Sequence, residues 1–170
     1  MKLTRHLAVG LVVLAIGATA ALSYFMDLDR VELAPDATFT RMDGTPAHVS
    51  QLRGKVVLVN FWATTCTICV KEMPQLVATH HKFSARGFET LAVAMSYDPP
   101  ASVVNFTESR RLPFTVVIDN TGSVARSFGD VKLTPTTVLI NKHGEIVKRY
   151  VGEPDFAALN RLIDRLLTEA

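Results

Sequence analysis

The sequence predicts an α/β domain in which a mixed central sheet is flanked by helices and preceded by a β-hairpin. Two largely apolar runs, residues 55–61 and 88–95, are typical of strands that are buried on both faces. Helical spacing after each run indicates the crossover helices that parallel strands require. Two turn sequences, Asp43-Gly44 and Asn141-Lys142-His143-Gly144, predict antiparallel hairpins near the two ends of the domain.

The predicted elements follow one another without an internal repeat. The early hairpin comprises residues 39–42 and 47–49, and a short turn over 50–54 leads into the strand at 55–61. A helix over 66–85 contains Pro74, where we expect a kink, and Gly87 ends it. The remaining elements are the strand at 88–95, a helix over 101–111, a strand over 114–118, a short helix over 124–128, strands over 136–140 and 146–151, and a final amphipathic helix opened by Pro154.

The N-terminus has the features of an export segment. Residues 7–26 form an almost charge-free run after Lys2 and Arg5, long enough to cross a hydrocarbon core of about 30 Å. The positive-inside rule then places everything after Met26 outside the cytoplasm. Because Ala18-Thr19-Ala20 resembles a cleavage site, a removed signal peptide remains an alternative to an uncleaved anchor. Both interpretations predict a periplasmic or otherwise extracytoplasmic domain, anchored to the inner membrane if residues 7–26 are retained.

This division also accounts for the charge of the chain. We expect residues 1–26 to be the membrane anchor or signal peptide, residues 27–37 a linker and residues 38–170 the globular domain. The net charge of +2 comes from Lys2 and Arg5, so the part after residue 26 is electrically balanced. Since it has neither a basic face nor a recognisable motif for nucleic acid, the sequence gives no support for binding DNA or RNA.

Both cysteines of the chain, Cys66 and Cys69, follow a buried strand directly and stand at the start of a helix. Free backbone N–H groups and the helix dipole favour a negative charge there, which lowers the pKa of a thiol. We therefore expect Cys66 to be the attacking thiolate and Cys69, one turn further on, to be the resolving thiol. A structural disulfide across so short a loop would add little stability. The nearest further metal-ligand candidates, His80 and His81, are expected on the exposed face of the helix, so we predict no metal site and no cofactor.

Between residues 36 and 168 the chain resembles the thioredoxin superfamily, and more closely its TlpA/ResA-like group of membrane-anchored, extracytoplasmic thiol-disulfide oxidoreductases. The resemblance rests on residues 55–74, KVVLVNFWATTCTICVKEMP, and on residues 133–140, LTPTTVLI. The early hairpin with Leu52-Arg53-Gly54, and Gly144 in the late hairpin, add to it. It implies a thioredoxin-like fold and an enzyme that exchanges thiols and disulfides.

The same resemblance implies roles for four further residues. Pro135 matches the family's cis-proline, which faces the cysteine pair and lets the preceding residue, Thr134, pair with an extended substrate segment. Trp62 matches an aromatic residue that packs beside the active site, and we assign it to substrate binding. Glu72 matches an acidic residue that assists proton transfer to or from Cys69, although a solvated surface charge would explain it equally well.

Several positions depart from the family pattern. Thr65 precedes the first cysteine where thioredoxins commonly carry Trp, and Asn60 stands where cytoplasmic thioredoxin has a buried acid. The intervening Thr67-Ile68 supplies neither a proline nor a histidine, so nothing local indicates the very low thiolate pKa of a strong DsbA-type oxidant. We therefore expect a reducing role.

The resemblance also implies partners. These are exported proteins with disulfides, such as apocytochrome c or copper-site assembly proteins, and a membrane electron donor of the thiol-disulfide type. Client contacts are expected around Trp62, Thr134 and residues 97–113. Two other functions stay open: a peroxiredoxin-like thiol peroxidase, which usually has Thr where this chain has Ala63, and a non-enzymatic copper carrier, which would need a wider cysteine spacing and a closing histidine.

Overall fold

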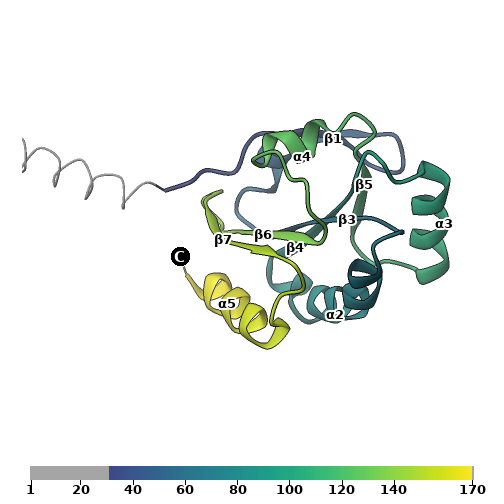
Figure 1. Ribbon diagram of the computed structural model, residues 1–170. Helices are drawn as coiled ribbons and strands as arrows, with labels where there is room; N and C mark the ends of the chain where they lie inside the picture. Colours follow the sequence, from purple (N-terminus) through teal and green to yellow (C-terminus); the bar gives the residue numbers. More distant parts are fainter. Residues whose placement is uncertain (1–30, 170) are drawn as a thin grey trace, which may run out of the picture. The chain divides into compact units, whose positions relative to one another are not determined.

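The computed structural model describes residues 31–169 (Figure 1). The predicted anchor or signal segment, residues 1–26, and the first part of the predicted linker lie outside the described residues. Within residues 31–169, no helix combines the length and the apolar character needed to cross a membrane. From Glu32 onward the chain forms one compact unit.

The centre of this unit is a five-stranded mixed sheet with the strand order β5-β4-β3-β6-β7. β3 (Val56–Trp62) pairs in parallel with β4 (Phe88–Ala94) on one side and antiparallel with β6 (Thr136–Ile140) on the other. β5 (Thr115–Ile118) extends the sheet in parallel beyond β4, and β7 (Ile146–Val151) closes the other edge antiparallel to β6. The predicted mixed sheet is confirmed, and the apolar run of β3 reflects burial along its whole length.

Two apolar cores lie on opposite faces of the sheet, because the side chains of β3 alternate between them. The even-numbered apolar residues of β3 share one core with α2 (Thr67–Phe83), α3 (Pro100–Arg110) and α5 (Phe156–Thr168). The odd-numbered ones share the other core with α4 (Ser123–Ser127) and the N-terminal hairpin. Figure 1 shows α2 and α5 on one side of the strands, with α4 and β1 on the other.

The predicted early hairpin forms a separate two-stranded sheet of β1 (Thr38–Thr40) and β2 (Pro46–His48). Its turn depends on Gly44, whose φ of +85° lies in the left-handed region that favours glycine. The Asp43 carboxylate stabilises the same turn by accepting a hydrogen bond from the backbone N–H two residues further on. The 3-10 helix η1 (Val49–Leu52) then leads into β3.

The limits of α2 follow from its end residues. It begins one residue later than predicted, because Cys66 has extended backbone angles and acts as the N-cap. It ends at Phe83 and is followed by the 3-10 helix η2 (Ser84–Arg86). The chain then turns at Gly87, whose φ of +91° permits the predicted stop.

The last helix, α5, begins at Phe156 and not at Pro154 as predicted. The Asp155 carboxylate accepts hydrogen bonds from the backbone N–H groups of Ala157 and Ala158, at 2.9 and 3.1 Å. These two N–H groups have no acceptor within the helix, so Asp155 is the N-cap and the proline lies outside.

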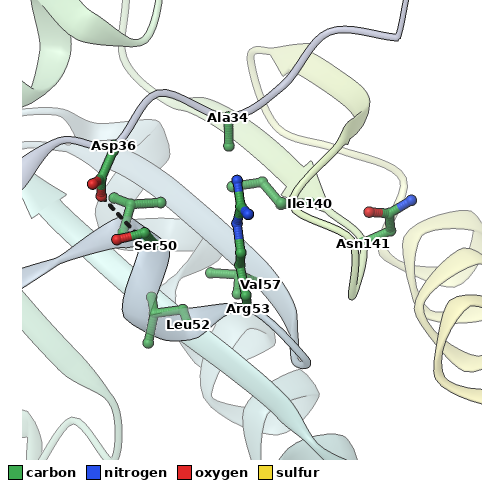
Figure 2. A pocket seen from close by; sticks show the side chains of 10 residues that line it. Ala34, Asp36, Ser50, Leu52, Arg53, Val57, Ile140 and Asn141 are labelled. Atoms are coloured by element: carbon green, nitrogen blue, oxygen red, sulfur yellow. Dashed lines mark hydrogen bonds between the residues drawn. The ribbon is translucent and has the colours of Figure 1, made fainter.

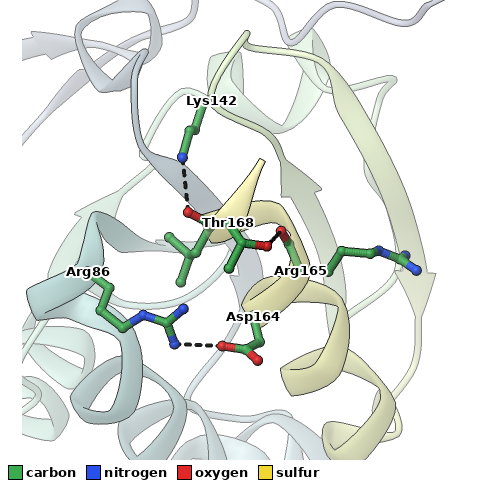
Figure 3. A network of polar contacts seen from close by, with 6 residues as sticks. Arg86, Lys142, Asp164, Arg165 and Thr168 are labelled. Carbon is green, nitrogen blue, oxygen red and sulfur yellow. Dashed lines mark hydrogen bonds and ion pairs between the residues drawn. The ribbon is translucent and has the colours of Figure 1, made fainter. Parts of the chain in front are cut away.

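Polar contacts tie α5 to segments that are distant in sequence (Figure 3). The Arg86 guanidinium donates to Asp164 at 2.6 Å, and the Lys142 ammonium donates to the Leu167 carbonyl at 3.0 Å. The amphipathic helix is therefore held at its C-terminal half from two directions.

The segment just before the hairpin, which was predicted as the end of a linker, is bonded to the β6–β7 turn. The Ala34 N–H donates to the Gly144 carbonyl at 2.8 Å, and the Ile146 N–H donates to the Glu32 carbonyl at 2.7 Å. Backbone pairing of this kind leaves no periodic side-chain pattern, which is why the sequence did not indicate it.

Candidate active site

Cys66 and Cys69 lie where β3 ends and α2 begins, and they are joined by a disulfide. The Cys66 Sγ accepts a hydrogen bond from the Cys69 backbone N–H at 3.2 Å, so the sulfur occupies the N-cap position of the helix. Cys66 is half-buried, whereas Cys69 is fully buried beneath it. A partner can therefore reach the sulfur of Cys66 but not that of Cys69, as expected of an attacking and a resolving thiol.

The Thr134-Pro135 loop lies beside the accessible sulfur. The Cys66 Sγ is 3.6 Å from the Thr134 carbonyl oxygen, and the Thr134–Pro135 peptide bond is cis. Pro135 is buried, and its carbonyl accepts a hydrogen bond from the Gly152 N–H at 2.8 Å. The structure thus brings Pro135 and Thr134 to the cysteine pair, across a separation of almost seventy residues.

Trp62 lies under the site rather than on its surface. Its side chain is fully buried in the same apolar core as Cys69, and its ring packs against Phe106 with centroids 5.2 Å apart. The prediction that Trp62 binds substrate is wrong, because a ring with no exposed area has no surface to offer a client. Trp62 supports the cysteine pair from within the core.

Glu72 is buried as well, which removes the interpretation of it as a solvated surface charge. It has no exposed area, and its Oε1 accepts a hydrogen bond from the Asn60 amide at 3.0 Å. The same amide donates to the Thr137 hydroxyl at 3.0 Å, while Glu72 Oε2 and Asn60 Oδ1 have no hydrogen-bond partner. Asn60 of β3 stands where cytoplasmic thioredoxin has a buried acid, and in this chain the buried acid beside it is Glu72 of α2.

Burial sets the acidity of this carboxyl group. Removal from water disfavours the charged form and raises the pKa of Glu72 from 4.5 to about 7, although the hydrogen bond from Asn60 opposes the shift. Glu153 adds a smaller increase through charge repulsion. A carboxyl group with a pKa near neutrality can both accept and return a proton under ordinary conditions.

His80 is placed differently from the prediction. It was expected on the exposed face of α2, yet it is buried against Phe114 and its Nδ1 lies 3.2 Å from the Thr90 hydroxyl. Burial lowers the pKa of His80, which favours a neutral ring. His81, its neighbour, is exposed as predicted.

Two residues at the start of the segment 97–113, where client contacts were expected, were given no role of their own by the sequence analysis. The buried Asp98 carboxylate accepts hydrogen bonds from the Thr64 N–H and the Thr64 hydroxyl, at 2.6 and 2.5 Å. The hydroxyl of Tyr97 lies 3.1 Å from that of Thr134. Their position in the sequence could have indicated these contacts, because residues that follow the carboxyl ends of adjacent parallel strands lie at the same edge of the sheet.

A separate cavity of about 30 Å³ lies between the segment that precedes β1, the 3-10 helix η1 and the strands β3 and β6 (Figure 2). Its lining includes Asp36, Ser50, Val57 and Ile140. Val57 is near the start of β3 and Ile140 ends β6, whereas the cysteines follow the other end of β3. The cavity has room for about one water molecule. It is therefore remote from the redox chemistry and too small for a substrate.

Comparison with known proteins agrees with this geometry. The sequence matches the family described as Redoxin over residues 31–163. Thiol-disulfide oxidoreductase ResA of Geobacillus kaustophilus is 36% identical over 155 residues, covering 89% of this chain and 88% of the relative. ResA of Halalkalibacterium halodurans is 36% identical over 141 residues, covering 81% and 79%. The crystal structure of a thiol:disulfide interchange protein of Chlorobium tepidum superposes with a TM-score of 0.74 at 27% identity, covering 81% of this chain and 97% of that one.

The predicted resemblance is thereby confirmed. A pair of cysteines separated by two residues is joined at the N-terminus of a helix, with one sulfur accessible and the other buried. Such a pair can pass between dithiol and disulfide and transfer two electrons each time. The chain belongs to the Redoxin family and is a thiol-disulfide oxidoreductase with a thioredoxin-like fold, acting on proteins that contain disulfides.

Proposed function

We propose that this oxidoreductase reduces disulfides of exported client proteins, with Cys66 as the attacking thiol and Cys69 as the resolving thiol. The observation that carries the proposal is the contrast between the half-buried Cys66, whose sulfur lies beside the Thr134 carbonyl, and the fully buried Cys69. The lack of a charged residue between the cysteines favours reduction over oxidation.

The reaction transfers two electrons in two exchanges. The Cys66 thiolate attacks one sulfur of the client disulfide, so that a mixed disulfide forms, the client S–S bond breaks and the other client sulfur leaves as a thiolate. Cys69 then attacks the Cys66 sulfur, which releases the second client sulfur and forms the Cys66–Cys69 disulfide. The two protons of the dithiol end on the two client thiols.

Glu72 is the proposed proton acceptor for Cys69. It lies one helical turn beyond Cys69 in α2, and both side chains are fully buried, so bulk water is excluded from the resolving step. A carboxylate whose pKa is about 7 can take the proton that Cys69 loses and later return it.

A group of exposed apolar side chains offers a contact surface for the client. Ile68 lies between the cysteines in the sequence, and Leu133 directly precedes Thr134. Tyr97 contacts Thr134 through its hydroxyl. Val151 pairs with the residue after Pro135. Each of these four side chains is about half exposed or more, at 49%, 64%, 57% and 64% in that order. We propose that an extended client segment pairs with the backbone at Thr134 and covers this surface.

The setting of the reaction is also part of the proposal. Residues 7–26 are proposed to anchor the domain on the extracytoplasmic side of the inner membrane, with cleavage of this segment as the alternative. A membrane protein of the thiol-disulfide type would return the Cys66–Cys69 disulfide to the dithiol. The apocytochromes and copper-site proteins named by the resemblance are the first clients to test.

The test uses the full-length chain in nonionic detergent and a peptide with a single disulfide. We expect stoichiometric reduction of the peptide by the dithiol protein, no turnover by Cys66→Ser, and a stable mixed disulfide on Cys66 in the Cys69→Ser variant. Trapping identifies native clients when the same variant is produced in cells and the adducts are analysed by mass spectrometry.

Three results would contradict the proposal. Activity in Cys66→Ser would remove the assigned nucleophile. A reduction potential near that of DsbA, about −120 mV, would indicate an oxidant. Faster turnover of peroxide than of disulfides, or stoichiometric binding of Cu(I), would favour the peroxidase or the copper carrier.

A further inference from the structure

We propose that Tyr97 and Asp98 are positioning residues, which fix the spacing between the loop before Cys66 and the Thr134-Pro135 loop. The inference rests on the proposed attack by Cys66, because its consequence is the placement of that sulfur beside the Thr134 carbonyl. Within the part of the chain that the structure describes, Tyr97 and Asp98 form no hydrogen bond with either sulfur, and they act through Thr64 and Thr134.

Asp98 holds the loop that leads to the nucleophile. Asp98 is 2% exposed, and both oxygens of its carboxylate accept hydrogen bonds from one residue, Thr64, through its N–H and its hydroxyl. A turn then closes from the Cys66 N–H to the Ala63 carbonyl at 3.1 Å. Hydrogen bonds to a buried carboxylate are among the strong ones, so the three residues from Ala63 to Thr65 have little freedom to move Cys66.

The sheet itself supports Asp98. The Asp98 N–H donates to the Met95 carbonyl at 2.9 Å, and the Met95 N–H donates to the Trp62 carbonyl at the end of β3, also at 2.9 Å. Asp98 is thus fixed to the central strand that precedes the cysteines. It cannot follow the Thr64 loop if that loop shifts.

Tyr97 connects the same turn to the other side of the site. Its hydroxyl lies 3.1 Å from the Thr134 hydroxyl, and the Thr134 carbonyl lies 3.6 Å from the Cys66 sulfur. Cys66 is therefore connected to Thr134 in two ways. One is the direct contact between its sulfur and the Thr134 carbonyl, and the other runs along the chain to Thr64, across to Asp98 and from Tyr97 to the Thr134 hydroxyl. Two independent connections between the same two loops determine their separation.

Asp119 provides a matched comparison for Asp98. It comes directly after β5, whereas Asp98 lies one turn beyond the end of β4. Asp119 is 3% exposed, and its carboxylate accepts a hydrogen bond from the Ala125 N–H at 2.9 Å. That bond stabilises α4, on the other face of the sheet from α2. A role in stability alone would make Asp98 and Asp119 equivalent, whereas a positioning role distinguishes them.

The first test compares Asp98→Asn with Asp119→Asn in the full-length chain. Turnover of the single-disulfide peptide is measured with an excess of a small dithiol that reduces the Cys66–Cys69 disulfide again, and the direct reaction of that dithiol with the peptide is subtracted. The pH is one at which the rate of the original protein no longer rises, and the temperature is one at which both variants are folded. We expect kcat to fall about tenfold in Asp98→Asn with KM within about twofold of the original, because the sulfur is misplaced while the client surface remains. Asp119→Asn is expected to keep kcat within about twofold, although it also lowers the unfolding temperature.

The second test changes the other end of the hydrogen bond. Thr64→Val removes the hydroxyl with little change in shape and should lower kcat, while Thr64→Ser keeps the hydroxyl and should restore most of it. The double variant of Asp98→Asn with Thr64→Val should lose no more than Asp98→Asn alone, because both changes break one connection.

The outcomes separate this inference from the proposed function. Equal kcat in the two aspartate variants, or equal kcat in Thr64→Val and Thr64→Ser, would overturn the positioning role while leaving the enzyme intact. Activity that survives Cys66→Ser, or a wild-type chain that reduces no peptide disulfide, would instead remove the proposed function.

Discussion

At the scale of single residues, Glu72 shows how burial gives a common side chain an uncommon property. Among residues 31–169 no cationic side chain pairs with its carboxyl group, and one of its oxygens has no hydrogen-bond partner. Burial raises its pKa to about 7, so the folded protein favours the protonated form while the unfolded chain has the ordinary value of 4.5. The folded state is therefore penalised as the pH rises from 4.5 through 7.

Replacing this group tests that sign. We expect Glu72→Gln to raise the unfolding free energy by only about 1 kcal/mol at pH 5 and by about 3 kcal/mol at pH 8, relative to the original protein. Urea denaturation of the disulfide form at the two pH values measures the difference. Glu89→Gln is the control, since it removes a surface ion pair with Lys55 and should change stability by less than about 1 kcal/mol at both. A gain from Glu72→Gln that is equal at pH 5 and pH 8 would show that burial does not raise the pKa of this carboxyl group in the way described.

The same replacement tests the chemistry of the site. If Glu72 accepts the proton of Cys69, Glu72→Gln should slow the resolving step by about tenfold or more, so that the mixed disulfide accumulates during turnover. Quenching the reaction with acid and separating the adduct by mass measures its fraction. An unchanged fraction would exclude Glu72 from this step.

At the scale of elements, the capping of α5 decides where the last helix begins. Asp155 satisfies two backbone N–H groups that the helix leaves without acceptors. We expect Asp155→Ala to lower the unfolding free energy by about 1 kcal/mol, and Asp155→Asn, which can still cap, to lower it by less. Urea denaturation checks this, and equal losses in both variants would indicate that the charge and not the cap matters.

The elements differ in how far the sequence could predict them. β6 and β7 have the predicted bounds, because turn residues and apolar runs delimit them. The cysteines and Thr134-Pro135 were found through their motifs. Glu72 and His80 stand next to Lys71 and His81 in a mixed helical pattern, and only the strands packed below decide which of each pair is buried. Contacts such as that of Asp98 with Thr64, 34 residues apart, leave no pattern in the neighbouring sequence, and only the pairing of β3 with β4 indicates them.

At the scale of the whole molecule, strand order assembles the site. β4 and β6 are the two neighbours of β3, one parallel and one antiparallel. The carboxyl ends of β3 and β4 and the amino end of β6 therefore share one edge of the sheet. Cys66 follows β3, Asp98 follows β4 and Pro135 directly precedes β6. The site therefore forms only when these three strands are paired.

The same sheet makes the two cores dependent on each other, which a single substitution can test. Phe39 of β1 is buried in the core opposite α2, whereas Trp62, the only tryptophan, lies in the core beneath α2. We expect Phe39→Ala to lower the unfolding free energy by about 3 to 5 kcal/mol, and to shift the urea midpoint of Trp62 fluorescence together with that of far-UV circular dichroism. Met42→Ala, at a side chain that is 40% exposed in the same hairpin, should shift neither by more than about 0.5 kcal/mol. Separate midpoints in Phe39→Ala would mean that the hairpin face unfolds without disturbing the face that carries the cysteines. Coincident midpoints would mean that the packing of the hairpin contributes to the stability of the redox site on the other side of the sheet.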